Sequence, residues 1–198
     1  MKSLNAMKTV PSTPIVAKVF HWINLISVTI MLLSGLQIYN ANPVFGGRGG
    51  VQIPPIFLLG GWLAGGRDWH FAAMNLFAAN LLAYGLYVLI TRRWKTRFVG
   101  VNDVKAMALS RSPQRKAYAV HRLVYTAIVP VLVGAIGSGL GMYKPAQFDW
   151  ILKLASDDWQ VLRMTHFMTV PIVLVFVVVH VALVWRVGAR KLVASMFW

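Results

Sequence analysis

The hydrophobic pattern of the chain contains four long runs without any Asp, Glu, Lys or Arg. They cover residues 19–47, 69–91, 123–143 and 164–185. A helix that rises about 1.5 Å per residue needs about 20 apolar residues to cross a hydrocarbon core of about 30 Å. Each run meets that length, so the pattern predicts four membrane-spanning helices. A fifth run, 49–66, holds six glycines and two consecutive prolines, which predicts a loop with an interfacial segment, IFLLGGWL.

These runs define the expected architecture. With their flanks, the predicted spans are 16–39, 69–91, 118–142 and 161–187. The segment VNDVKAMALS, between the second and third spans, predicts a short amphipathic helix. The remaining loops are too short to house a catalytic domain. We therefore expect one all-α integral membrane domain over residues 1–198, folded as a four-helix transmembrane bundle.

The distribution of charge predicts how the spans are oriented. The chain has 20 Lys and Arg against five acidic residues, and its net charge of +15 could also indicate a nucleic-acid binder. With both termini in the cytoplasm, fifteen basic residues lie inside and five outside, in agreement with the positive-inside rule. The charge therefore indicates topology and contact with anionic membrane lipids, with no nucleic acid as partner. The first apolar run is too long for a signal peptide, so we expect it to stay as an anchor.

All five histidines lie in the predicted spans or at their ends: His21, His70, His121, His166 and His180. Ionisable side chains at membrane depth are costly and usually mark a function. His21 and His180 are expected at a similar depth near the cytoplasmic surface, whereas His70 and His166 are expected near the outer surface. The chain thus supplies one pair of histidines to each leaflet.

The fourth span contributes to both pairs. His166 and His180 are fourteen residues apart, which is about 21 Å along a helix and places them within about 40° of the same face. Two neutral imidazoles at one level are fewer than the four ligands that zinc normally takes, and copper, which is conceivable here, usually adds Cys or Met. A b-type haem needs two axial ligands and suits a dry bundle interior. The absence of cysteine excludes covalent c-type haem, so the pattern favours two stacked haems of b type.

Glycines near the histidines fit this interpretation. Gly35 lies fourteen residues after His21, on the same face of the first span but at the outer depth, where a missing side chain would make room for a haem. Gly134, Gly137 and Gly141 form a smooth stripe on the third span. That stripe either faces the outer haem or serves helix packing through small residues, and both interpretations stay open.

Basic side chains at the span ends are candidate partners of haem propionates. Arg67 and Arg163 could pair with those of the outer haem, and Arg122 or Lys18 with those of the inner one. The topology of the flanking charges explains these residues equally well.

His121, beside Arg122 at the cytoplasmic start of the third span, has no partner at its level by the pairing above. It is an interfacial histidine without a role, a hydrogen-bond donor to a quinone or a propionate, or an axial ligand in place of His21. A quinone near the inner haem would need hydrogen-bonding groups, for which His121, Arg122 and Asn24 are the local candidates.

Three of the spans resemble a known family. The segments HWINLISVTIMLLSGLQIY, RDWHFAAMNLFAANLLAYGLYVLI and RMTHFMTVPIVLVFVVVH look like spans of the bacterial di-haem cytochrome b561-type membrane subunits. These include the formate dehydrogenase gamma subunit, the b-type subunit of nickel–iron hydrogenases and thiosulfate-reductase-like cytochrome b. The resemblance implies that His70 and His166 hold an outer haem b, that His21 and His180 hold an inner one, and that quinone binds on the cytoplasmic side.

The resemblance also implies a partner. The loop with GGRGG and IPPIFLLGGWLAGGRDWH departs from a typical hydrogenase or formate dehydrogenase subunit and looks more like the thiosulfate-reductase-like branch. Partners in that branch tend to be periplasmic molybdenum enzymes. We therefore expect a multi-pass protein of the bacterial inner membrane that moves electrons between the quinone pool and a periplasmic redox subunit. Residues 43–67 and 144–160 are the expected docking face.

Two other functions stay open on the sequence. A basic funnel at Arg48, Arg67 and Arg163 would suit a stand-alone quinone-coupled oxidase of a small substrate such as superoxide, although the outer aspartates offset that charge. A non-redox transporter or membrane anchor could use the histidines as proton relays.

Overall fold

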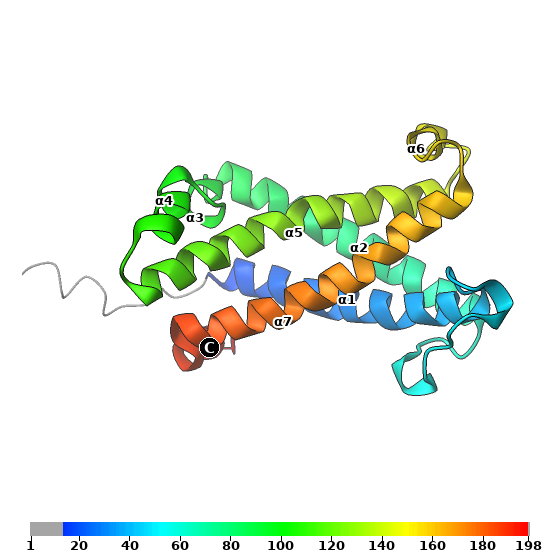
Figure 1. Cartoon of the computed structure of the whole chain (residues 1–198), viewed down its shortest axis with the longest axis horizontal. Coiled ribbons are helices and arrows are strands. Elements are labelled where there is room, and N and C mark those ends of the chain that lie inside the picture. Colours follow the sequence, from blue (N-terminus) through cyan, green and yellow to red (C-terminus); the bar gives the residue numbers. More distant parts are fainter. Residues whose placement is uncertain (1–13, 198) are drawn as a thin grey trace, which may run out of the picture.

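A computed structural model describes residues 14–197, and all regular structure among them is helical. The elements are α1 (Ile15–Ala41), η2 (Gly47–Gly49), η3 (Pro55–Phe57), α2 (Leu63–Ile90), α3 (Trp94–Arg97), α4 (Val101–Leu109), α5 (Pro113–Tyr143), α6 (Asp149–Leu154) and α7 (Trp159–Phe197). The four long helices are long and apolar enough to cross a membrane, and they extend along the long axis of the molecule (Figure 1). The predicted all-α architecture with four spans is confirmed, and α4 confirms the predicted short helix.

The second span begins at Leu63, six residues before the predicted start at residue 69. The chain turns into α2 at Gly60, whose φ of 114° is open to glycine and strained for other residues. Gly66, in the first turn, packs against α1 so closely that a Cβ there would lie 2.9 Å from Gln37 Cγ. The uncharged run 49–66 is therefore a loop up to residue 62, as predicted, and its last residues belong to the span.

The third and fourth spans also extend beyond their predicted bounds. α5 begins at Pro113, where the Ser112 hydroxyl oxygen accepts a hydrogen bond from the Arg115 N–H at 3.4 Å. Serine before the helix and proline in its first turn are typical of helix starts, because both suit backbone groups that have no partner within the helix. α7 continues past residue 187 to Phe197.

The four spans form two hairpins. α1 packs along α2, and α5 packs along α7, whereas the two hairpins touch each other far less. Small polar residues are buried in the hairpins, with Ser27 and Ser34 on α1 and Ser138 on α5. Each serine hydroxyl donates to a carbonyl one turn earlier in its own helix. This satisfies the hydroxyl in an apolar interior and leaves a short side chain where helices approach closely.

We call the end of the bundle that holds His70 and His166 the outer end, and the opposite end, with α3 and α4, the inner end. At the inner end, a buried ion pair joins Asp103 of α4 to Arg122 of α5, with Nη1 and Oδ2 2.6 Å apart. Arg115 lies 3.3 Å from the other carboxylate oxygen, and Arg122 also donates to the Phe98 carbonyl. Asp103 further accepts from the Gly100 N–H at 3.0 Å. These bonds fix the loop between α2 and α5 onto α5.

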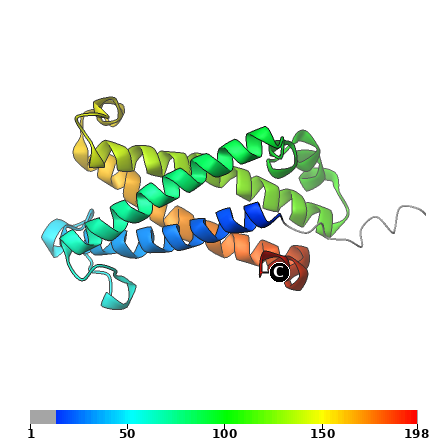
Figure 2. The ribbon, with the colours of Figure 1, turned by 180° about the vertical axis from the view of Figure 1, so that it is seen from behind.

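At the outer end, two segments lie beside the bundle on opposite sides, η3 next to the α1–α2 hairpin and α6 next to the α5–α7 hairpin (Figures 1 and 2). Ile56 of η3 and Leu154 of α6 are 83% and 78% exposed. The interfacial segment predicted from the sequence therefore presents apolar side chains at its surface. The two halves of the expected docking face, 43–67 and 144–160, are joined where the Gln160 side chain donates a hydrogen bond to the Val44 carbonyl at 3.0 Å.

Candidate functional site

The outer end brings together the two histidines predicted to pair there. His70 on α2 and His166 on α7 face each other with their ring centroids 6.2 Å apart. The two residues come from different hairpins, so the packing of one hairpin on the other sets their spacing.

Hydrogen bonds fix the tautomer of His70. Its Nδ1 lies 3.0 Å from the Met31 carbonyl oxygen and 3.3 Å from Ser34 Oγ. The Ser34 hydroxyl already donates to the Ile30 carbonyl at 2.6 Å, so its oxygen is left to accept. Both neighbours accept, and Nδ1 therefore carries the proton. The other ring nitrogen, Nε2, is then free to bind a metal.

His166 is held in the same way from α5. Its Nδ1 lies 3.0 Å from Ser138 Oγ, and the Ser138 hydroxyl donates to the Gly134 carbonyl at 2.7 Å. The serine oxygen thus accepts from Nδ1–H, which again leaves Nε2 available for a metal.

A glycine stands beside each of these histidines. A Cβ at Gly35 would lie 3.3 Å from His70 Cε1, and a Cβ at Gly139 would lie 3.2 Å from His166 Cε1. Gly35 was predicted to make room at the outer depth and does lie against this site. Gly139 was missed, although the repeated triplet Ser-Gly-Leu, at 34–36 and 138–140, was a signal that could have found it.

Of the predicted glycine stripe, one residue fits the interpretation of helix packing. A Cβ at Gly141 would lie 2.8 Å from Ile151 of α6, so this glycine serves helix packing. Gly134 and Gly137 face open space in the described structure.

The inner end brings three histidines together. The His180 ring centroid lies 6.5 Å from that of His21 and 5.5 Å from that of His121. Phe176, one turn before His180, stacks on it with centroids 5.6 Å apart. Among the side chains that the structure describes, which excludes those after residue 186, we find no hydrogen bond that would fix a tautomer of these three histidines.

The donor sets at both ends fit a haem. With metal–nitrogen bonds of about 2 Å and a ring centroid about 1.1 Å further, two imidazoles on opposite sides of one metal place their centroids about 6.2 Å apart. The His70–His166 distance of 6.2 Å and the His21–His180 distance of 6.5 Å agree with this spacing. The His121–His180 distance of 5.5 Å is shorter. Among the described residues, no group of three or more His, Asp or Glu side chains is arranged to hold a bare metal ion.

Two of the predicted propionate partners already bind the protein. At the outer end, Arg163 donates to the Asn42 carbonyl at 2.7 Å and to the Gln160 side chain at 3.0 Å. At the inner end, the Arg122 guanidinium bonds Asp103 and the Phe98 carbonyl. In this structure both arginines connect a helix to a loop, whereas Arg67 is exposed at the outer end.

The inner end also contains polar residues between helices. Asn24, a quinone candidate, accepts a hydrogen bond from Asn80 Nδ2 at 2.7 Å, and Asn80 donates to the Phe20 carbonyl at 3.0 Å. The hydroxyls of Tyr84 and Tyr125 lie 3.2 Å apart and connect α2 to α5. This tyrosine pair was missed, because tyrosines near span ends are expected as interfacial anchors.

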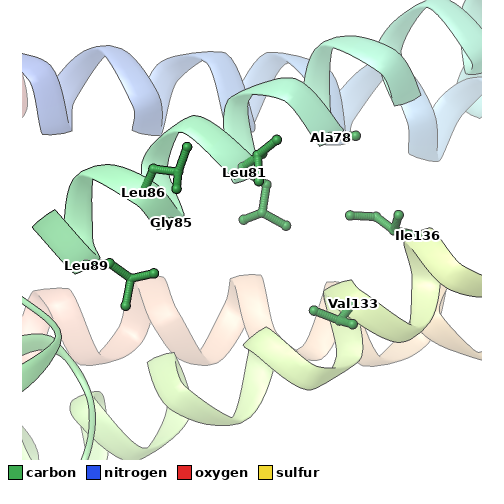
Figure 3. Close-up of a pocket in the computed structure, with 8 residues that line it drawn as sticks. Ala78, Leu81, Gly85, Leu86, Leu89, Val133 and Ile136 are labelled. Atoms are coloured by element: carbon green, nitrogen blue, oxygen red, sulfur yellow. The ribbon is translucent and has the colours of Figure 1, made fainter.

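An apolar groove of about 420 Å³ runs between α2 and α5 (Figure 3). Its lining residues are Ala78, Leu81, Leu82, Gly85, Leu86, Leu89, Val133 and Ile136. Tyr84, whose hydroxyl meets that of Tyr125, is on the same helix as most of the lining residues but is not one of them.

The fold and its two histidine clusters define a membrane cytochrome with four spans. The chain belongs to the prokaryotic cytochrome b561 family, whose family model matches residues 12–198. It is similar to an Azospira oryzae protein provisionally named protein-methionine-sulfoxide reductase subunit YedZ1. The two are 33% identical over 188 residues, and the match covers 90% of this chain and 92% of the relative. No solved structure shows a significant match.

Membership of this family identifies the chain as a haem-binding electron-transfer subunit that crosses the bacterial inner membrane several times.

Proposed function

We propose that the chain holds two b-type haems, one at each end of the bundle, and moves electrons between the quinone pool and a periplasmic oxidoreductase. The observation that carries this proposal is the pair of histidines at each end, His70 with His166 and His21 with His180. Their ring centroids are 6.2 and 6.5 Å apart, so both imidazoles of each pair could hold one haem.

Each pair of histidines would bind one of the two haems. His70 and His166 would hold the outer haem through Nε2, and His21 and His180 would hold the inner one. When bound, each haem supplies reversible one-electron chemistry of its iron. The chain supplies the axial nitrogens, an apolar interior that keeps water out, and a single domain whose fourth span contributes a ligand at both levels.

The inner end is the proposed quinone side. The groove between α2 and α5 is apolar, as an isoprenoid tail requires, and phenol, imidazole and amide groups stand close to the inner histidines. His121, with an imidazole that the His21–His180 pair does not need, is the first candidate to bind a quinone oxygen. Tyr125, one turn after it, and Asn24 are the next, while Arg122 would support this region by fixing the loop.

The outer end is the proposed partner side. With both termini in the cytoplasm, this end faces the periplasm, as the distribution of basic residues predicts. The relative from Azospira oryzae is named as a subunit of a protein-methionine-sulfoxide reductase, which supports an oxidoreductase as partner for this chain. A molybdenum enzyme is the partner class that the family resemblance implies.

No specific observation favours the stand-alone oxidase of superoxide. Of the arginines in the proposed basic funnel, Arg163 is bound to Asn42 and Gln160, so its charge is not directed at a substrate path.

The test is a visible spectrum, with haem quantitation, of the purified protein before and after addition of a soluble quinol. We expect a b-type spectrum, two haems per chain and reduction by the quinol. A colourless protein would contradict the proposal and favour a non-redox anchor or transporter. A haem protein that no quinol reduces would contradict the quinone assignment alone.

His21→Ala and His121→Ala identify the inner ligand. We expect the first variant to lose one haem and the second to keep both, because the His21–His180 spacing of 6.5 Å is closer than the His121–His180 spacing of 5.5 Å to that of two imidazoles on opposite sides of one metal. If His121→Ala loses a haem and His21→Ala does not, the assignment of His21 is wrong.

A further inference from the structure

The triplet Ser-Gly-Leu occurs twice, at 34–36 on α1 and at 138–140 on α5. In each hairpin it lies opposite the outer histidine of the partner helix. The serine oxygen meets the histidine Nδ1, at 3.3 Å for Ser34 and 3.0 Å for Ser138. The glycine stands beside the same imidazole, at the carbon between its two nitrogens. The two hairpins therefore present their outer histidines through the same local arrangement.

Each serine is oriented to accept and not to donate. The Ser138 hydroxyl proton is directed to the Gly134 carbonyl at 2.7 Å, and that of Ser34 to the Ile30 carbonyl at 2.6 Å. The lone pair that remains is then available to the imidazole N–H. Ser27 makes the same kind of bond to the carbonyl of Ile23, four residues before it on α1, and among the described residues it has no hydrogen bond to a histidine.

The two serines differ in how close they lie to the Nδ1 of the histidine that they bind. His70 has a second and closer acceptor, the Met31 carbonyl at 3.0 Å. His166 also has a backbone carbonyl partner, that of Ala135, but Ser138 Oγ lies closer to its Nδ1, at 3.0 Å, than Ser34 Oγ lies to that of His70, at 3.3 Å. Loss of Ser138 should therefore change the ring orientation of His166 more than loss of Ser34 changes that of His70.

We propose that Ser138 and Ser34 are positioning residues for the outer haem, which fix the ring orientation of His166 and His70 and lower the midpoint potential of that haem. The inference rests on the proposed function, because it needs a haem between these two histidines. An acceptor on Nδ1–H makes Nε2 a stronger electron donor to a bound metal. A stronger axial donor stabilises the oxidised, more positive iron, and this lowers the potential.

The inner histidines lack such partners within the described residues, so the arrangement affects one haem only. It gives the two haems different potentials in a chain whose four axial ligands are of the same residue type.

The test is a redox titration, followed by visible absorbance, of the purified wild-type protein and of Ser138→Ala, Ser34→Ala and Ser27→Ala. We expect Ser138→Ala to shift one of the two midpoint potentials upward and to leave the other unchanged. Ser34→Ala should shift the same potential upward by less. Ser27→Ala, a matched loss of a buried hydroxyl on α1, should shift neither, and Ser138→Thr, which keeps the hydroxyl, should restore the wild-type value.

The inference is overturned if Ser138→Ala leaves both potentials unchanged, or if Ser27→Ala shifts them as much. If Ser138→Ala does not retain haem but Ser138→Thr does, the positioning role is supported by haem content. If wild-type protein contains no haem, the proposed function fails and the inference with it, whereas failure of the serine variants alone leaves the proposed function intact.

Discussion

The outer and inner ends of the bundle hold their histidines in different ways. At the outer end, His70 and His166 are each bound by a serine on the helix that packs beside them. At the inner end, His21, His121 and His180 meet through their rings alone among the described residues. The strong polar contacts there, between Asp103 and Arg122, fix a loop. The outer geometry is therefore built into helix packing, whereas the inner geometry depends on the loop and on what binds there.

The largest effect is expected from a substitution that crowds the outer histidine site and leaves the inner one unchanged. Gly139→Val adds methyl groups where a Cβ alone would lie 3.2 Å from His166 Cε1. Because a packed interior cannot absorb that volume, the imidazole should move and haem content should fall by about half. Haem quantitation measures this. Gly85→Val is the control, since a Cβ at Gly85 meets nothing within 4 Å, and equal loss in both variants would contradict the account.

The inner end should respond to a change that contacts none of its histidines. Asp103→Ala leaves the Arg122 guanidinium without its buried carboxylate, which costs on the order of 3 kcal/mol. We expect a lower temperature of thermal unfolding and release of the inner haem before the outer one, followed by absorbance on heating. Arg115→Ala should have a much smaller effect, because Arg115 is 43% exposed and lies farther from Asp103. Simultaneous loss of both haems would show that the loop stabilises the two ends alike.

A smaller effect is expected from the tyrosine pair. Tyr125→Phe removes the hydroxyl bond to Tyr84 and a candidate quinone partner, while the ring stays in place. Loss of one such hydrogen bond should slow reduction by quinol about five-fold with both haems retained. Stopped-flow absorbance measures the rate. Tyr87→Phe, on the helix that carries Tyr84, is the control, and an equal rate in wild type and Tyr125→Phe would place the quinone elsewhere.

The smallest effect is expected at the outer surface. Lys153 and Asp149 of α6 form an ion pair at 2.7 Å, with side chains 65% and 60% exposed. The Lys153 ammonium lowers the pKa of Asp149 through a hydrogen bond and its charge. Because exposed pairs are hydrated and screened, Lys153→Ala should leave thermal unfolding and haem content unchanged. A measurable loss of either would show that α6 stabilises the outer haem site.

The spans and the pairing of histidines by depth could be predicted from the sequence. The length of an apolar run and the distance of a residue from the end of that run are local properties. They led to the four spans and to the meeting of His70 with His166 and of His21 with His180. Gly35 was found in the same way, from its spacing to His21.

The hydrogen bonds that side chains make to other helices and to loops could not be predicted. A serine in an apolar helix usually bonds its own backbone, and Ser27, Ser34 and Ser138 all do so. Which of them also meets a histidine depends on which helix packs beside it. Long arginine side chains pose the same problem, since Arg122 and Arg163 reach loop carbonyls that the span pattern does not place.

The most direct test of the central claim is the ratio of haem to protein in His166→Ala, His180→Ala and the double variant. In the proposed function these residues are the ligands that one helix, α7, would supply at both levels. We predict that each single variant keeps one haem, that the remaining haems differ in midpoint potential, and that the double variant binds none. If either single variant loses both haems, or the double variant retains one, the assignment of one haem to each end of α7 is wrong.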